Sequence, residues 1–112
     1  MSDVTVAAIH SALNGLALRQ RVIADNIANI NTPGYHAKKV EFESALASAV
    51  SDGAGSVDAN VRSSLEPTRE DGNNVNLDHE TLANVDTGLR YQLMLRAMDG
   101  KFGLLRDSIR GQ

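Results

Sequence analysis

The chain has 112 residues, of which 42% are hydrophobic and only 4% aromatic, so it can form one small domain but lacks the bulky side chains that usually fill a compact core. Its net charge of -3 is spread over interleaved acidic and basic residues, which argues against binding to nucleic acid or anionic lipid. The absence of cysteine excludes disulfides and thiolate metal sites.

The first predicted element is a long helix over residues 1–30. Its large apolar residues recur every three or four positions, and Gln20 fills the one polar position of the series: Val6, Ile9, Leu13, Leu16, Ile23, Ile27 and Ile30. This spacing is typical of a coiled-coil seam. About 27 residues at roughly 1.5 Å each give a helix of about 40 Å, which is long for an ordinary globular helix.

This helix is expected to end near Ile30, where a tight turn begins. Pro33 disfavours helical backbone at Thr32, and Pro33-Gly34 fits the two central positions of a type II turn. Such a turn directs Tyr35 back towards the end of the helix.

Two amides, Asn26 and Asn29, lie in the apolar seam just before the turn. Burying an amide without a partner is costly, so we expect both to hydrogen-bond a neighbouring segment or another subunit. The alternative is a helix C-terminus with ordinary turn chemistry.

Residues 31–76 form a middle segment with weak patterning. Phe42, Leu46, Ala49 and Val50 have helical spacing and predict a short helix, and the Ser, Gly and Asp residues of 51–56 predict a flexible linker. The stretch 57–70 allows a short strand or hairpin, and the run Asp71-Gly72-Asn73-Asn74 is a strong turn signal.

The last predicted element is a C-terminal helix over residues 77–112, and it has two apolar stripes about 180° apart. The first stripe is Tyr91, Leu95, Met98, Phe102, Leu105 and Ile109, and the second is Leu82, Val85, Leu89, Leu93, Ala97 and Leu104. One partner helix can cover only one stripe, so we infer that other subunits cover the second. The whole chain is therefore expected to be one mainly α domain, with its two long helices paired as a coiled coil around a short irregular middle.

No pattern of catalytic or ligand-binding residues is found. His10, His36 and His79 lie on different segments without a second ligand at metal-site spacing, and no nucleophile elbow or phosphate-binding glycine loop is present. We expect no enzyme activity, cofactor, metal ion or small-molecule substrate. The sequence also shows no signal peptide and no apolar run near the roughly 20 residues of a membrane span, which by itself favours a cytoplasmic protein.

The run from Asp25 to Tyr35 closely resembles the N-terminal signature of the axial proteins of the bacterial flagellum, the rod, hook and hook-associated proteins. The positions that match this assembly motif are Asn26, Ile27, Asn29, Thr32, Pro33, Gly34 and Tyr35. The family usually has Asn where this chain has Asp25. The runs 71–78, Leu89-Arg90-Tyr91-Gln92 and 101–106 are similar to those of the proximal-rod members, and the short middle fits them too.

This resemblance implies a structural subunit that assembles with copies of itself and other flagellar rod proteins into a hollow helical shaft that transmits torque. It further implies contacts with the junction protein between rod and basal ring and with the flagellar export gate. The implied location is the periplasmic rod of the basal body, reached by type III export without a cleaved signal. Two alternatives stay open, a rod protein further from the membrane and a soluble helical adaptor or export chaperone with a groove-binding C-terminal helix.

Overall fold

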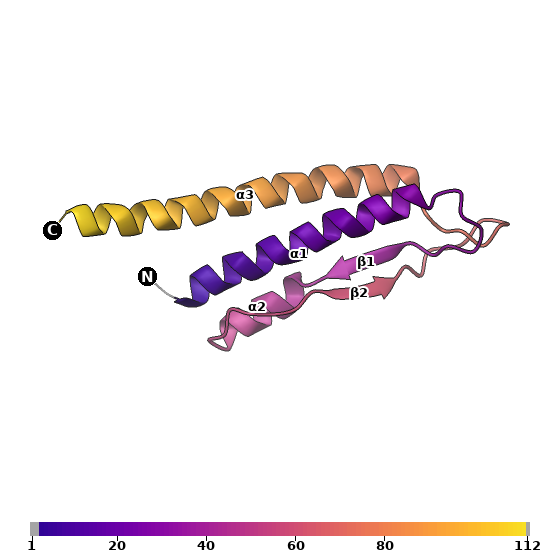
Figure 1. Cartoon of the computed structure of the whole chain (residues 1–112). Helices are drawn as coiled ribbons and strands as arrows, with labels where there is room; N and C mark the ends of the chain where they lie inside the picture. Colours follow the sequence, from indigo (N-terminus) through magenta and orange to yellow (C-terminus); the bar gives the residue numbers. More distant parts are fainter. Residues whose placement is uncertain (1–2, 112) are drawn as a thin grey trace.

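A computed structural model describes residues 3–111, and it is mainly helical. The elements in chain order are α1 (Asp3–Ala28), β1 (Lys38–Glu41), α2 (Glu43–Ser51), β2 (Asn60–Ser63) and α3 (Leu77–Arg110). Figure 1 shows that α1 lies between α3 on one side and the layer formed by α2, β1 and β2 on the other. The predicted fold class, two long paired helices with a short middle, is confirmed.

Helices α1 and α3 run antiparallel. Asn26, near the end of α1, contacts Glu80 in the first turn of α3, and Gln20 lies beside Gly88. In this antiparallel pair, each step forward along α1 corresponds to one step back along α3. Extending the two facing pairs to the start of α1 places Asp3 near residue 104 of α3. The last turns of α3 therefore extend past the start of α1, as Figure 1 shows. Within residues 3–111, neither of these helices nor α2 has the length and apolarity needed to span a bilayer.

The side of α1 that faces the middle segment is built around small residues. The Phe42 ring packs on Gly15, where an added Cβ would lie 2.6 Å from a ring carbon. The guanidinium group of Arg19 stacks over the same Phe42 ring, with its central carbon 5.0 Å from the ring centroid. The core cluster consists of Ala12, Leu16, Val22, Val40 and Phe42. The predicted seam thus describes only part of the buried surface, because α1 is covered on two sides.

The middle segment contains the predicted short helix and, within 57–70, one short strand rather than a hairpin. Strands β1 and β2 pair antiparallel, with Val40 opposite Val61, and α2 lies between them in the chain. Strand β1 is not predicted by the sequence pattern, because a four-residue strand with one buried side chain gives little alternation.

The prediction that 51–56 is only a flexible linker needs correction at Gly55. This glycine is buried against α1, where an added Cβ would lie 2.5 Å from the Val4 carbonyl oxygen. The Ser11 hydroxyl donates to the Gly55 carbonyl at 3.0 Å and accepts from the Val57 amide at 3.3 Å. A close backbone approach therefore anchors the loop that follows α2.

Candidate functional site

The segment that ends α1 forms the turn that its sequence predicts. The helix ends at Ala28, the Tyr35 amide donates to the Thr32 carbonyl at 3.2 Å, and Gly34 has a φ of 75°. This positive φ between Pro33 and Tyr35 is what a type II turn requires. The Tyr35 hydroxyl then donates to the Asn26 side-chain oxygen at 3.0 Å, so the predicted return of Tyr35 to the helix end is confirmed.

Asn26 is completely buried, and its amide uses its hydrogen-bonding capacity within the chain. Its Oδ1 accepts from the Tyr35 hydroxyl and from the Lys38 amide, both at 3.0 Å. Its Nδ2 donates to the Lys38 carbonyl at 2.9 Å and to Glu80 Oε1 at 3.1 Å. One side chain thus joins the end of α1 to the turn, to the start of β1 and to the start of α3.

This geometry decides between the two kinds of partner that the sequence allows for the amides. Asn26 bonds neighbouring segments of its own chain, and its side chain offers no surface to another subunit. Asn29 makes local contacts, donating to the Asp25 carbonyl at 2.8 Å and accepting from the Thr32 hydroxyl at 3.0 Å. Of the two kinds of partner expected, Asn26 therefore has the first, neighbouring segments of its own chain, while the Asn29 side chain makes the ordinary contacts of a helix end.

The second sequence signature, the turn at residues 71–74, packs directly on the first. The buried side chain of Asn73 donates to the carbonyls of Asn29 and Thr32, both at 2.9 Å, and accepts from the Val75 amide at 2.7 Å. The Gly34 amide donates to the Asp71 carbonyl at 2.8 Å. Two motifs about 45 positions apart in the sequence therefore form one structural unit.

Two more residues complete this unit: Asn74, which belongs to the predicted turn at 71–74, and Arg69, which the sequence pattern did not single out. Asn74 accepts from the Ala37 amide at 2.6 Å and donates to the Glu66 carbonyl at 3.0 Å. Arg69 donates to the carbonyls of Ile30 and Val75, both at 2.7 Å. The three buried asparagines Asn26, Asn73 and Asn74, with the segments they connect, are called the asparagine junction below. The sequence signal for this buried unit is the pair of amides, Asn73 and Asn74, that follows Asp71-Gly72. A turn in solvent does not need two amide side chains, because water can satisfy its backbone groups.

Two ionisable groups border the asparagine junction. Burial raises the pKa of the Glu80 carboxyl, and the hydrogen bond from Asn26 acts in the opposite direction. Burial also raises the pKa of the Tyr35 hydroxyl, with smaller contributions from the negative charges of Asp25 and Glu80. The tyrosine therefore stays protonated and keeps donating to Asn26 at neutral pH.

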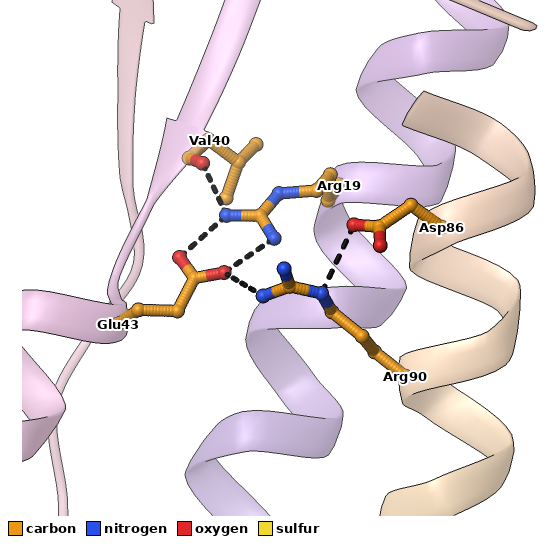
Figure 2. A network of polar contacts seen from close by, with 5 residues as sticks. All are labelled: Arg19, Val40, Glu43, Asp86 and Arg90. Atoms are coloured by element: carbon orange, nitrogen blue, oxygen red, sulfur yellow. Dashed lines mark hydrogen bonds and ion pairs between the residues drawn. The ribbon is translucent and has the colours of Figure 1, made fainter. Parts of the chain in front are cut away.

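A second polar network links α1, the start of α2 and α3 further along the molecule, as Figure 2 shows. Arg19 binds both oxygens of Glu43 at 2.6 Å and donates to the Val40 carbonyl at 2.7 Å. Arg90 lies 3.4 Å from Glu43 and 2.9 Å from Asp86. The hydrogen bond from Arg19 lowers the pKa of Glu43 to about 2, so the network is ionised at physiological pH.

The two apolar stripes of α3 differ in how much of each is covered. In the first stripe, Tyr91 and Met98 are half-buried on the side of α1. Two residues outside the predicted stripe lie on the same side: Met94 is half-buried and Thr87 is buried. Leu95, Phe102, Leu105 and Ile109 of that stripe are exposed. The second stripe faces away from α1, and its large side chains, called the outer row below, are between 57% and 70% exposed: Leu82, Val85, Leu89, Leu93 and Leu104. The remaining predicted position, Gln92, is also exposed.

Among residues 3–111, no group of three or more His, Asp or Glu side chains is placed to hold a metal ion. Arg90 of the predicted assembly helix is used in ion pairs within the chain. What is left uncovered is an apolar row on α3 that runs from Leu82 to Leu93 and includes Leu104 further along, a feature that marks interaction surfaces in folded proteins.

Comparison with known proteins gives consistent matches. Residues 9–36 match the family model for the flagella basal body rod protein. The chain is similar to the flagellar basal body rod protein FlgB of Bacillus subtilis (strain 168), with 33% identity over 96% of this chain and 94% of the relative. It is 36% identical to FlgB of Escherichia coli (strain K12), over 88% of both chains. It is 37% identical to FlgB of Borreliella burgdorferi, over 76% of this chain and 80% of the relative.

Proposed function

Because the chain belongs to the FlgB family of flagellar basal body rod proteins, we propose that it is a structural subunit of the proximal rod. In this role it assembles with copies of itself and with other rod proteins into a hollow helical shaft that transmits the torque of the motor. The paired helices form the stiff part of the subunit, and the asparagine junction locks one end of the pair.

The observation that carries this proposal is the outer row of α3. Its five large apolar side chains lie on the face of α3 opposite α1 and are mostly exposed. Fully burying one such side chain stabilises a protein by about 1.5–3 kcal/mol, so covering the whole row against neighbours supplies a substantial driving force for assembly. Contacts that do not close into a ring generate an open helical array, which is the architecture of a shaft.

The finer parts of the proposal rest on family analogy. They are contacts with the junction protein between rod and basal ring and with the flagellar export gate, and a location in the periplasmic part of the basal body. The chain would reach that location through type III export without a cleaved signal peptide. Membership of a rod family supports assembly with other basal-body components in general.

The test uses a flagellated bacterium that lacks its own FlgB-type protein and produces the tagged chain. We expect the tag in purified basal bodies, at the membrane-proximal end of the rod, and restored motility. A tag found only in the cytosol would contradict the proposal and favour the adaptor or chaperone alternative. A tag found only in the distal part of the rod would favour the distal-rod alternative.

A matched pair of variants tests the role of the outer row. Leu93 is 60% exposed, so Leu93→Glu should leave the monomer folded but should strongly reduce incorporation into basal bodies. Thr81→Glu adds the same charge at an exposed polar position of the same helix and should incorporate normally. Normal motility with Leu93→Glu would mean that this row stays in solvent in the assembled rod.

A further inference from the structure

A small apolar groove opens where α1, the start of α2 and α3 meet. It has a volume of about 290 Å³ and is lined almost entirely by apolar atoms. It is lined from α1 by Ala12 and Leu16, from the start of α2 by Phe42, Glu43, Leu46 and Ala47, and from α3 by Arg90 and Met94. Its apolar lining suits apolar side chains of a protein, which pack by contact between such surfaces.

An apolar ridge that could fill such a groove lies at the far end of α3. Phe102, Leu105 and Ile109 follow a three-then-four spacing and fall on one face, the same face that packs on α1 earlier in the helix. They are 54%, 46% and 68% exposed, and Leu105 and Ile109 lie past the start of α1. The ridge is thus a continuation of a packing surface without its partner helix.

The ridge cannot enter the groove of its own chain. Leu105 lies eleven residues beyond Met94 on the same helix, which is about 16 Å at roughly 1.5 Å per residue. A second copy supplies the ridge without this restriction. Residues 41–58 carry four acidic and no basic side chains, of which Glu41 and Glu43 are already ion-paired within the chain to Arg62, Arg19 and Arg90. Asp52 and Asp58 are the acidic charges that favour contact with residues 101–110, which carry three basic and one acidic side chain.

We infer that the groove receives the ridge of a second copy of this chain. Each copy then gives its ridge to one neighbour and its groove to another, which is a head-to-tail contact. A neighbour lying parallel to the first copy would be displaced along the helix axis by about 16 Å, the distance from Leu105 to the level of Met94. The inference rests on the proposed function, since it names the partner in rod assembly and the surface that meets it.

The test exploits the lack of cysteine in the chain. Ala47, at the exposed edge of the groove, and Leu105 are both replaced by cysteine, and purified basal bodies that contain this variant are oxidised. A disulfide needs Cα atoms within about 7 Å, so the two positions can react only between copies. We expect tagged dimers and higher multimers on a non-reducing gel. Each single-cysteine variant should stay monomeric.

The control pair combines Ala47→Cys with Leu65→Cys, because Leu65 is apolar and 91% exposed but lies outside the ridge. This pair should give no cross-link. The inference is overturned if the Ala47–Leu105 variant incorporates into basal bodies but stays monomeric, or if the control pair cross-links equally well. It is also overturned if a photo-cross-linking residue at Ala47 captures only a different rod protein. In all three results the chain is still found in the rod, so the proposed function would stand.

Discussion

Replacing Asn26 by leucine should unfold much of the asparagine junction. Leucine has a similar size but cannot pair with the Lys38 amide and carbonyl, whose hydrogen bonds to Asn26 are part-buried. Each group left unpaired away from water costs about 1–3 kcal/mol, and Tyr35 and Glu80 also lose their Asn26 partner. We therefore expect a loss of about 2–5 kcal/mol, which is a large share of the roughly 5–15 kcal/mol that stabilises a typical domain.

Asn29→Leu is the matched control, because it removes an amide of the same motif at the same helix end. The Asn29 side chain makes only exposed local hydrogen bonds, so its replacement should cost no more than about 1 kcal/mol. Urea unfolding followed by far-ultraviolet circular dichroism gives the free energy of unfolding for both variants. Amide hydrogen exchange at Lys38 adds a local measurement and should become much faster only in Asn26→Leu.

The reasoning fails if the two variants lose the same stability, or if Asn26→Leu unfolds at the same urea concentration as the parent chain. Either result would mean that the buried hydrogen bonds of Asn26 do not hold the three segments together. If Asn26→Leu is as stable as the parent but does not assemble, Asn26 acts through contacts between subunits, which its complete burial within the chain argues against.

Two further predictions concern packing and charge. Gly15→Ala should destabilise the chain by about 1–3 kcal/mol, because the new methyl group would meet the Phe42 ring at 2.6 Å. Gly100→Ala is the control, because its methyl group meets nothing within 4 Å; it should stabilise the isolated chain by up to about 1 kcal/mol. Equal melting temperatures for the two variants would mean that the Phe42 ring does not pack tightly on Gly15. Glu43 has a pKa lowered from 4.5 to about 2, so its ion pairs stabilise the fold fully above pH 4.5 and lose this effect as the pH falls through 2. The difference in unfolding free energy between the parent and Glu43→Gln should therefore shrink as the pH falls from 4.5 to 2. It should stay below about 1 kcal/mol throughout, because the Glu43 side chain is 44% exposed. A difference that grows in acid would mean that the charged form of Glu43 does not stabilise the fold.

Helical periodicity and turn chemistry were enough to predict the main elements. The C-terminal helix begins at Leu77 as expected, and Pro33-Gly34 makes the predicted turn. These features depend on residues close together in the sequence, where backbone preferences act directly. The opposite positions of the two stripes on α3 were also predictable, because the helix fixes the angle between side chains.

The contacts between distant segments were not predictable from one sequence. The pairing of Asn73 with the end of α1 depends on how two turns approach one another, and no local pattern encodes that approach. The same holds for Gly15 and Gly55, whose missing side chains matter only because Phe42 and the backbone of α1 lie so close. Asn26 was correctly recognised as unusual, but its partners belong to its own chain.

In the assembled rod, the outer row of α3 should be an interface between subunits. A cryo-electron microscopy map of a rod base that contains this chain would show whether it is. We expect neighbouring subunits to cover Leu82, Val85, Leu89 and Leu93, and the asparagine junction to keep the hydrogen bonds of the single chain. A map in which this row faces solvent or an open channel would mean that the row is not an assembly surface.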